Sequence, residues 1–505
     1  MTELLAELDG GKLVAPGDSA WSILQHGIDA GPDKTAVVAQ HQHPDHLGHL
    51  VGTGPTPNKC LTWTYAQLQR AAARLGSVLD THDVPPGCTI VTFVTNRAEC
   101  TLMSWTTALK CYTLVPLDPG TLEPARRDEL QFYLSKLLPT VVVLEDEAGA
   151  ATVDGLRDVN RDIFLGLSLD PLTKPREDWI SMADIAQMPF TDQQSTAKPP
   201  VDHPDRVVEM IYTSGTSSPM PKVCQKTVKN ALASVANNSG SGAPPPLVAI
   251  IHTPFFGAFS LGLSSTIWYD GGTVVIPSPR FSLDSSLKAI ETFHGELIGF
   301  MPSKIYLVAQ HPEYSREKVR SLKCVFLSGE VITQETLQEA QEVFPNAAIY
   351  PAHGMSEGIG VFGWPSGMPD PVPEFGHVAS SGIAMPSTKV KIVDKQGGVV
   401  KRLETGEMHL SSDCLIDKYS ESFLNDQYFY EDGGRRWLKT GDIAALDEVG
   451  YVYILGRCRD IITIRGIQVI PVYLESCIHK HTGIQVCGTL LEDLVYALTI
   501  PRLKS

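Results

Sequence analysis

The chain has 505 residues, 43% of them apolar, so it is long enough to bury several hydrophobic cores. Its formal net charge of -16 at pH 7 argues against a surface for nucleic acid or anionic membrane, because neutralising phosphates requires clustered Lys and Arg. The 10 cysteines include no C-x-x-C pair, which argues against a disulfide framework or a zinc site of that type.

Neither end of the sequence carries a recognisable targeting signal. Residues 1–9 are acidic and lack the basic start and apolar middle of a signal peptide. Residues 502–505, Arg-Leu-Lys-Ser, differ from the peroxisomal S-K-L address, and no uncharged apolar run reaches membrane-spanning length. We therefore expect a cytoplasmic protein without a membrane span.

A histidine-rich segment follows a predicted strand at residues 36–39. Residues 41–46, His-Gln-His-Pro-Asp-His, fit H-x-H-x-D-H, the binuclear metal signature of the metallo-β-lactamase fold, and such a set can bind zinc. The competing interpretation is a solvated loop, because residues 31–61 are rich in Gly, Pro and His. A metal hydrolase is therefore retained as an alternative.

Alternating helices and strands are predicted along most of the chain. Residues 65–79 carry apolar side chains at helical spacing, 89–94 are β-rich, and 99–109 read as a helix entered through Asn96. Apolar runs typical of buried strands follow at residues 140–144, 247–251, 273–276 and 324–327. This alternation predicts an α/β fold with largely parallel sheets. From about residue 378, shorter strands such as 389–393 and 407–410 predict a β-rich subdomain.

A loop rich in hydroxyl groups follows an apolar strand that ends at Tyr212. Gly215 lets the backbone pass close to an anion, and Lys222 supplies a mobile cation. Neutral hydrogen-bond donors come from the side chains of Thr213, Ser214, Thr216 and Ser217. The loop is not a Walker A motif, because Pro221 stands where that motif has a glycine. Such a loop is more often an ordinary turn, so a polyphosphate site depends on the motifs that follow.

Further motifs follow this loop in a fixed order: Phe-Leu-Ser-Gly-Glu at 326–330, His-Gly-Met-Ser-Glu at 353–357, Lys-Thr-Gly-Asp at 439–442, Gly-Arg-Cys-Arg-Asp at 456–460, Arg-Gly at 465–466 and Pro-Val-Tyr-Leu-Glu at 471–475. In this order and spacing the sequence resembles the adenylate-forming superfamily of acyl-CoA synthetases, nonribosomal peptide synthetase adenylation domains and luciferases. Residues 61–68 and 112–119 resemble its first two core segments, so the resemblance covers nearly the whole chain.

The resemblance implies an α/β protein with two domains. The N-terminal domain, residues 1–458, would contain two layered α/β subdomains plus a distorted β-barrel, the β-rich part being about 378–458. Residues 459–505 would form a shortened α+β lid, with strands near 486–490 and 496–500. The family's late Gly-Lys motif has no match here, Lys504 being the nearest lysine, and Arg459 stands where the hinge is usually Asp or Lys.

The resemblance also implies roles around ATP. Lys222 and the hydroxyl-rich loop would hold the β- and γ-phosphates, Glu357 would carry Mg²⁺, and Ser356 would touch the α-phosphate. Asp442 would accept hydrogen bonds from both ribose hydroxyls, and Arg457 would donate to the same sugar. The residues expected around adenine are Ser328, Gly329, Glu330 and His353, and Gly354 and Met355 are also expected to bind the nucleotide. Each residue alone has a structural explanation, such as a turn cap or a surface ion pair. Such explanations do not account for the occurrence of all these residues together in the order and spacing of the family.

The acyl substrate is predicted from residues 252–260, which resemble the family's acyl-pocket motif. Phe256 stands about where amino-acid-activating domains present an Asp to the α-ammonium group. Because a buried ammonium without a counter-charge is costly, we expect an aliphatic or aromatic carboxylic acid without an α-amino group. The expected pocket residues are His252, Phe255, Phe256, Gly257, Phe300 and Met301. The competing interpretation is that these aromatic side chains belong to the core.

Residues 354–358, Gly-Met-Ser-Glu-Gly, also fit the G-x-S-x-G nucleophile elbow of α/β-hydrolases. That motif must open a helix, and the glycines and prolines of 359–373 would break one. An esterase is therefore a further alternative.

The sequence thus predicts a ligase that uses ATP and Mg²⁺ to adenylate a small carboxylic acid. The acyl group would pass to coenzyme A or to the phosphopantetheine of a carrier protein, and the sequence does not choose between these acceptors. A contrasting possibility, favoured by the unmatched late lysine, is a remnant that binds nucleotide or acyl-AMP without turnover.

Overall fold

The computed structural model describes residues 4–52, 59–156, 164–190, 199–213, 221–241, 247–464, 467–469, 471, 486–489 and 495–498. Ser214, Gly215, Thr216 and Ser217 of the predicted phosphate loop lie outside these ranges. So do the Arg-Gly motif at 465–466, residues 472–475 of the last motif, and Lys504.

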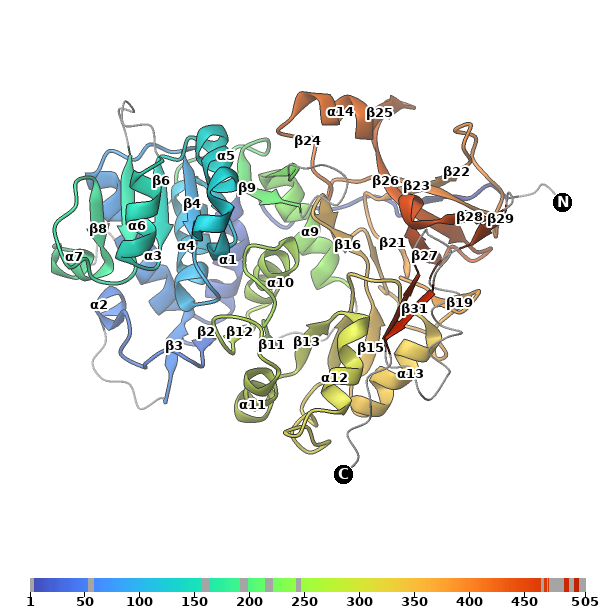
Figure 1. The fold of residues 1–505 in the computed structure, drawn as a ribbon, viewed down its shortest axis with the longest axis horizontal. Coiled ribbons are helices and arrows are strands. Elements are labelled where there is room, and N and C mark those ends of the chain that lie inside the picture. The colour runs from blue at the N-terminus through green and yellow to red at the C-terminus, as the bar shows by residue number, and fades with distance from the viewer. Residues whose placement is uncertain are drawn as a thin grey trace.

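The first sheet has eight strands and occupies the blue-to-green side of the molecule (Figure 1). Strands β4 to β8 run parallel to one another, β9 adds parallel to β5, and β10 and β24 extend the edge in antiparallel fashion. In sheet order the strands are β24 (Lys418–Tyr419), β10 (Val223–Thr227), β9 (Val207–Tyr212), β5 (Thr113–Pro116), β4 (Thr89–Phe93), β6 (Val141–Leu144), β7 (Leu165–Ser168) and β8 (Trp179–Ser181).

The second sheet has seven strands and is parallel except for β3, which pairs antiparallel with β2. In sheet order the strands are β15 (Ala348–Pro351), β14 (Cys324–Leu327), β13 (Leu297–Phe300), β11 (Val248–Ile250), β12 (Thr273–Ile276), β2 (Thr35–Ala39) and β3 (Leu61–Thr64). Most of these strands are continuous apolar runs, as expected where helices cover both faces of a parallel sheet.

Helices fill the layers around these two sheets. One core cluster contains side chains from both sheets together with α1 (Ala20–Ala30), α3 (Tyr65–Thr81), α4 (Ala98–Lys110), α9 (Val228–Ser239) and α10 (Ala258–Tyr269). At its centre Trp105 of α4 packs edge-on against Trp268 of α10, with ring centroids 5.9 Å apart. A second cluster joins the outer face of the first sheet to α5 (Arg127–Leu137) and α6 (Glu147–Asp154). A third joins the second sheet to α11 (Leu283–Phe293), α12 (Ile305–Ala309) and α13 (Gln334–Val343).

The shorter helices connect these layers and the sheets. They are α2 (Gly48–Val51), α7 (Met182–Gln187), α14 (Ser422–Tyr428) and the 3₁₀ helices η1 (Pro119–Leu122), η2 (Pro124–Arg126), η3 (Pro302–Lys304) and η4 (Cys458–Asp460). Among the described residues, none of the helices combines the length and the apolar character needed to cross a membrane.

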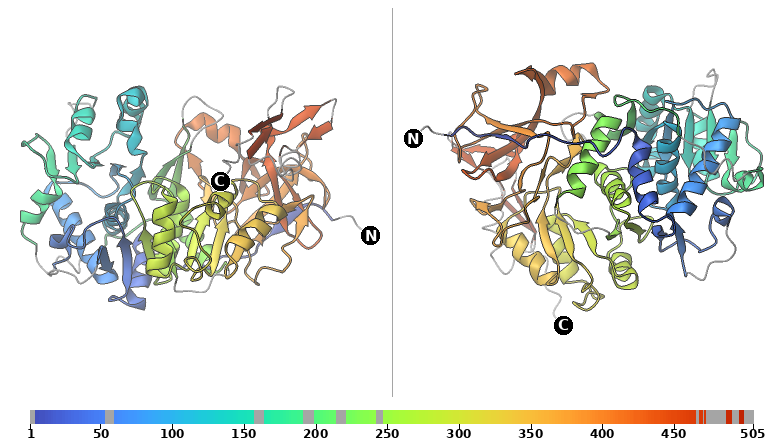
Figure 2. Two further views of the ribbon diagram at one scale, coloured as in Figure 1. Left: turned by 60° about the horizontal axis from the view of Figure 1, so that its bottom comes forward. Right: turned by 180° about the vertical axis from the view of Figure 1, so that it is seen from behind.

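The third sheet has six antiparallel strands and stands where the sequence predicts the β-rich subdomain. Its strands are β1 (Glu7–Asp9), β22 (Lys389–Val393), β23 (Thr405–Ser411), β26 (Arg435–Leu446), β25 (Phe429–Asp432) and, beside β26, β27 (Val452–Arg457). Seen from behind, the blue N-terminal segment crosses the orange strands before the chain reaches α1 (Figure 2). This contribution of β1 is not predicted from the sequence.

Five two-stranded antiparallel sheets complete the part of the fold that the structure describes. They pair β16 (Gly354–Met355) with β17 (Gly358–Ile359), β18 (Phe362–Gly363) with β21 (Ile383–Ala384), β19 (Glu374–Phe375) with β20 (Val378–Ala379), β28 (Ile462–Ile464) with β29 (Ile467–Val469), and β30 (Val486–Thr489) with β31 (Val495–Leu498). The last pair confirms the two strands predicted near residues 486–490 and 496–500.

The α/β class and the predicted helices and strands are confirmed, with one correction at Asn96. Helix α4 begins at Ala98, and its N-cap residue is Arg97. The Asn96 amide instead donates to the Thr253 carbonyl at 2.9 Å and accepts from the Phe255 N–H at 3.0 Å. Asn96 therefore ties the first sheet to the segment after β11, because a buried side-chain amide uses both its donor and its acceptor where partners exist.

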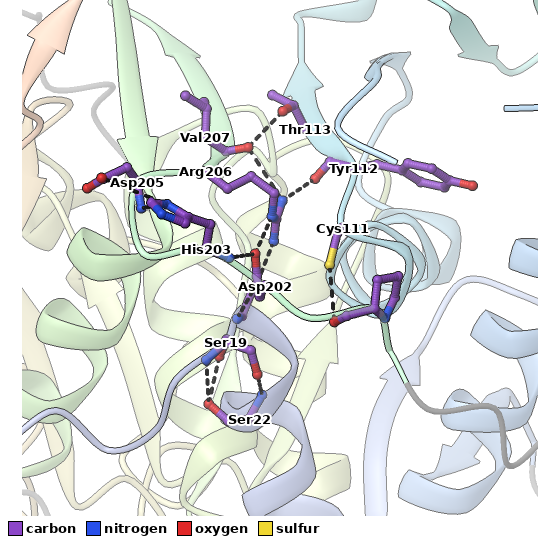
Figure 3. Close-up of polar contacts among 12 residues, drawn as sticks. Ser19, Ser22, Cys111, Tyr112, Thr113, Asp202, His203, Asp205, Arg206 and Val207 are labelled. Carbon is purple, nitrogen blue, oxygen red and sulfur yellow. Dashed lines mark hydrogen bonds and ion pairs between the residues drawn. The ribbon is translucent and has the colours of Figure 1, made fainter. Parts of the chain in front are cut away.

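A buried ion pair joins the start of α1 to the first sheet (Figure 3). Asp202 accepts two hydrogen bonds from the Arg206 guanidinium, at 2.5 and 2.9 Å, and one from the Ala20 N–H at 3.1 Å. Arg206 also donates to the Tyr112 carbonyl at 2.8 Å. The Asp202 side chain is only 1% exposed, so the pair is desolvated and geometrically fixed.

Candidate active site

A cavity of about 770 Å³ lies where the three sheets meet, beside α9 and α10. Several predicted site residues line it, and they come from widely separated parts of the chain: Thr213, Lys222, Gly257, Ser328, Gly329, His353, Gly354, Met355, Ser356, Glu357 and Arg457. In Figure 1 the helices α9 and α10 and strand β16, which carry or adjoin these residues, lie at the centre of the molecule.

The predicted ribose-binding pair is created by strand register. Asp442 of β26 lies directly opposite Arg457 of β27, and Arg457 Nε is 3.2 Å from Asp442 Oδ1. Arg457 also donates from Nη1 to the Thr440 carbonyl at 3.1 Å, which fixes the guanidinium at the cavity wall. Burial raises the pKa of Asp442 to about 6, although Arg457 acts to lower it.

Asp442 Oδ2 is buried and accepts no hydrogen bond from any described residue. His353 Nε2 lies 3.8 Å from it and is likewise buried and without a hydrogen-bond partner among the described residues. Burial lowers the pKa of His353 to about 4, so the ring is neutral at physiological pH. An unpaired buried carboxylate oxygen is costly, and a sugar hydroxyl is the kind of donor that satisfies it. The residues present therefore fit the ribose of a nucleotide.

The residues predicted to hold the phosphates and magnesium, Lys222 and Glu357, line the same cavity. The Lys222 carbonyl accepts from the Thr213 N–H at 2.9 Å, so the two ends of the hydroxyl-rich loop are joined by the backbone. The Lys222 ammonium lies over the Tyr428 ring, 3.6 Å from its centroid. This cation–π contact stabilises the partly desolvated ammonium group without neutralising its charge.

Glu357 lies in the tight turn between β16 and β17, and its Oε1 accepts a hydrogen bond from the Tyr419 hydroxyl at 2.6 Å. No described residue donates to Oε2, so that oxygen is available as a ligand for a hard cation such as Mg²⁺. The rings of Tyr419 and Tyr428 pack edge-on at 5.8 Å and so support both Glu357 and Lys222. Sequence reasoning missed both tyrosines, because neither belongs to a motif that signals a binding site.

The expected adenine wall is only partly as predicted. Ser328 and Gly329 follow β14 and line the cavity, and the backbone at Gly329 has φ +92°, which favours glycine. Glu330 turns away, since its carboxylate accepts from the Ser303 N–H and hydroxyl, both at 2.8 Å. Glu330 therefore caps the start of η3, and the cavity lining does not include it.

The predicted acyl-pocket residues also lie elsewhere, except for Gly257. His252 is buried, with one ring nitrogen 2.8 Å from the Gly299 carbonyl and the other 3.0 Å from the Ser286 hydroxyl. Phe300 stacks on Phe344 in the core, and Phe255 is 2% exposed. Met301 is 44% exposed, and neither it nor Phe256 belongs to the cavity lining.

Other residues of the 252–260 segment, and the helix that begins within it, form this part of the cavity wall. Because α10 begins at Ala258, its 3.6-residue period turns Phe259, Leu263 and Ile267 toward the cavity. From the preceding loop, Thr253, Pro254 and Gly257 also line the cavity. The helical spacing of the apolar side chains at 259, 263 and 267 was the sequence signal for these cavity-lining residues.

The two alternative motifs do not form the sites they suggest. Among the described residues, which include 41–46, no group of three or more His, Cys, Asp or Glu side chains is arranged to hold a metal ion. His46 Nε2 instead contacts buried Glu99 at 2.7 Å. Ser356 lies in the β16–β17 turn, and no helix begins there among the described elements, so the G-x-S-x-G match is not a nucleophile elbow.

Comparison with protein families gives one match that covers most of the chain. The model of the family described as AMP-binding enzyme matches residues 24–420. An acyl-CoA ligase of Pestalotiopsis microspora is 29% identical over 518 residues, covering 98% of this chain and 88% of that protein. 4-Coumarate–CoA ligase 4 of Arabidopsis thaliana is 24% identical, covering 83% of this chain and 73% of that protein. A 4-coumarate–CoA ligase of Humulus lupulus is 28% identical, but the match spans 54% of its length.

Solved structures share the fold. ATP-bound MatB of Rhodopseudomonas palustris has a TM-score of 0.74 at 19% identity, covering 92% of this chain and 84% of that one. The o-succinylbenzoate CoA synthetase of Bacillus subtilis, solved with its acyl-adenylate intermediate, has a TM-score of 0.71 at 21% identity, covering 96% and 85% of the two chains. With the matched family model, these comparisons show that the chain belongs to the AMP-binding enzyme family and is an adenylate-forming enzyme of the acid–thiol ligase class.

Proposed function

We propose that this protein adenylates a carboxylic acid with ATP and then transfers the acyl group to coenzyme A. The observation that carries the proposal is the gathering of Lys222, Glu357 and Arg457 around one cavity. Asp442 is not itself part of the lining, but it pairs with Arg457 behind the cavity wall, and its second oxygen is unpaired among the described residues. The relatives named CoA ligases support the choice of acceptor.

The residues divide the reaction between them. Asp442 and Arg457 hold the ribose and thereby fix the nucleotide at one end of the cavity. Lys222 neutralises phosphate charge, and Ser356 offers a hydroxyl to the α-phosphate. Bound at Glu357, Mg²⁺ would supply further positive charge for the departing pyrophosphate. A carboxylate oxygen of the acid attacks the α-phosphorus, the bond to the β-phosphate oxygen breaks, and the thiolate of the acceptor later displaces AMP from the acyl carbon.

The acid in this proposal lacks an α-amino group. Phe256, at the position where amino-acid-activating domains carry an Asp, gives no counter-charge for an ammonium group. The first residues of α10 that line the cavity, Ala258, Phe259 and Ser260, are uncharged. An α-ammonium group would therefore be desolvated without a partner at this end of the cavity.

The domain division also remains a proposal. We place the boundary near residue 458, where β27 ends and η4 begins, with the following residues forming the lid. Arg459 lines the cavity beside this boundary, as expected of a hinge residue near the site.

The test measures AMP release with panels of amino acids, fatty acids and aryl acids, each with and without coenzyme A. Acid-dependent AMP and an acyl-CoA product are expected with a fatty or aryl acid. If AMP release and acyl transfer occur only with a phosphopantetheinylated carrier protein, the acceptor is that carrier protein and not coenzyme A. Preference for an amino acid would overturn the acid class, and no AMP with any acid would favour a nucleotide-binding remnant.

A further inference from the structure

The cavity extends well beyond the nucleotide end, along the whole of α10. Phe259, Leu263, Ile267 and Asp270 line it at intervals of four, four and three residues, which places them on one face of the helix. The rise from Phe259 to Asp270 corresponds to about 16 Å at 1.5 Å per residue.

The opposite wall follows the second sheet from the carboxyl ends of its strands to their amino ends. Ser328 and Ala352 follow the carboxyl ends of β14 and β15, whereas Leu247 and Leu297 stand at the amino ends of β11 and β13. Residues at both ends line the same cavity, so the cavity reaches from the predicted adenine side to the amino ends of these strands.

The middle of the cavity has an apolar wall whose side chains are tightly packed. Besides Leu263 and Ile267, its wall contains Leu297, Phe326, Ile359 and Phe362. Two glycines admit the larger side chains. A Cβ atom at Gly262 would lie 2.1 Å from Ile359 Cδ1, and one at Gly299 would lie 2.6 Å from Phe259 Cζ. This part of the cavity suits a hydrocarbon chain or ring.

The far end is polar. Ser239, the last residue of α9, donates its hydroxyl to Asp270 Oδ1 at 2.5 Å. Asp270 is half-buried, and burial raises its pKa. Among the described residues, no donor reaches Asp270 Oδ2 and no Lys, Arg or His side chain forms an ion pair with this carboxyl group.

The hydroxyl protons of two other side chains at this end, Thr266 and Ser241, are donated to backbone carbonyls. Thr266 donates its hydroxyl to the Gly262 carbonyl at 3.0 Å, and Ser241 donates to the Asn238 carbonyl at 2.6 Å. Their hydroxyl oxygens can still accept hydrogen bonds, but Asp270 is the carboxylate among these three side chains, and an ionised acceptor makes the stronger hydrogen bond. A carboxylate at the end of an apolar passage selects for a ligand that donates a hydrogen bond there.

We propose that the acid is an elongated, largely apolar molecule with a hydrogen-bond donor, a hydroxyl or an amino group, at its far end. Asp270 accepts the hydrogen bond from this group. This inference rests on the proposed adenylation and specifies its substrate class. The distance along α10 accommodates on the order of a dozen bonds, since a C–C bond of about 1.5 Å advances roughly 1.3 Å along an extended chain.

The experiment compares kcat/KM for AMP formation with dodecanoic, ω-hydroxydodecanoic, ω-aminododecanoic and dodecanedioic acids, and with butyric acid as the short control. The ω-hydroxy or ω-amino acid is expected to exceed dodecanoic acid by about ten- to a hundredfold, the range for a hydrogen bond to a charged group. Their ranking distinguishes a neutral donor from a cationic one. Dodecanedioic acid, which places a second carboxylate against Asp270, is expected to be poor.

Asp270→Leu should abolish this preference while retaining or raising activity with dodecanoic acid, which also shows that the variant folds. Ser239→Ala should keep the preference because Asp270 remains. Asp284→Leu, at a side chain 70% exposed on α11, is the matched control and should behave as the parent protein.

Equal kcat/KM for all the dodecanoic derivatives, unchanged by Asp270→Leu, would overturn the inference while leaving adenylation intact. Butyric acid as the best substrate would overturn the proposed length. Failure of every acid to yield AMP, including those of the fatty and aryl panel, would instead contradict the proposed function itself.

Discussion

At the scale of single residues, Asp442 shows function and stability in opposition. Its pKa rises from 3.8 to about 6 on folding because the carboxyl group is buried. The folded protein therefore binds this proton more tightly than the unfolded chain does. The resulting contribution to stability is fully present below about pH 4 and is lost as pH rises through about 6, a difference of roughly 3 kcal/mol.

Asp442→Asn should therefore stabilise the protein at neutral pH while weakening its use of ATP. We expect the free energy of unfolding at pH 8 to rise by up to roughly 3 kcal/mol, since a neutral amide replaces a buried charge. The KM for ATP should rise at least tenfold, because the ribose loses a charged acceptor. Denaturant unfolding and steady-state kinetics measure the two effects. Destabilisation at pH 8, or an unchanged KM, would contradict this role of Asp442.

The same pKa predicts a pH dependence of nucleotide use. As pH falls through about 6, Asp442 takes up a proton and no longer accepts hydrogen bonds from two sugar hydroxyls. The KM for ATP should therefore rise below pH 6 in the parent protein and stay level in Asp442→Asn. A rise of equal size in the variant would assign the titration to another group.

Lys222 is expected to act in the reaction rather than in folding. Lys222→Met should lower kcat/KM by about a hundred- to a thousandfold, the range for one lost group that stabilises transition-state charge. The lost contact with the Tyr428 ring should cost only about 0.5–1 kcal/mol of stability. Lys323→Met, at a surface ion pair with Glu296, is the control for a lost charge and should leave kcat/KM unchanged.

At the scale of elements, the sequence predicts best what local patterns encode. The continuous apolar runs at β6, β11, β12 and β14 identify buried strands directly, because a strand covered on both faces needs no polar alternation. Long-range pairing leaves no such signal: nothing around residues 7–9 indicates that β1 pairs with β22, more than 350 residues away.

The same limit applies to the candidate site. Motif order predicts the residues that gather at the nucleotide end, but not which neighbouring side chain faces the cavity. Phe256 and Phe259 are equally apolar, and only the start of α10 turns Phe259 inward. Glu330 follows two cavity-lining residues, yet its carboxylate caps η3 because the Ser303 amide is within reach. Both outcomes depend on tertiary geometry that residue type does not encode.

The buried pair of Asp202 and Arg206 tests how the elements are joined. Arg206→Ala should cost about 3–5 kcal/mol of unfolding free energy, because it leaves a carboxylate 1% exposed without its cation. Burial opposes ionisation of Asp202, but the hydrogen bonds from Arg206 and the backbone outweigh it and lower its pKa. This stabilisation is therefore present above about pH 4 and is lost as pH falls through the lowered pKa.

A matched surface pair gives the control for that measurement. Arg320 contacts Glu317 with both side chains more than 60% exposed, so Arg320→Ala should change stability by less than about 1 kcal/mol. Equal effects of Arg206→Ala and Arg320→Ala would show that the buried pair does not join α1 to the first sheet.

At the scale of the whole molecule, the site exists only where three sheets meet. Lys222 immediately precedes β10 of the first sheet, Ser328 follows β14 of the second, and Asp442 and Arg457 belong to the third. Binding a nucleotide should therefore stabilise the packing of all three sheets together, because every sheet contributes a contact to the ligand.

The central claim is that an oxygen of the acid attacks the α-phosphorus of ATP within this cavity. The most direct measurement follows ¹⁸O from a doubly labelled carboxylic acid through a complete turnover with coenzyme A, using mass spectrometry of the nucleotide and phosphate products. One labelled oxygen in AMP, with unlabelled pyrophosphate, is the expected result. Unlabelled AMP, or label in inorganic phosphate formed together with ADP, would contradict the account.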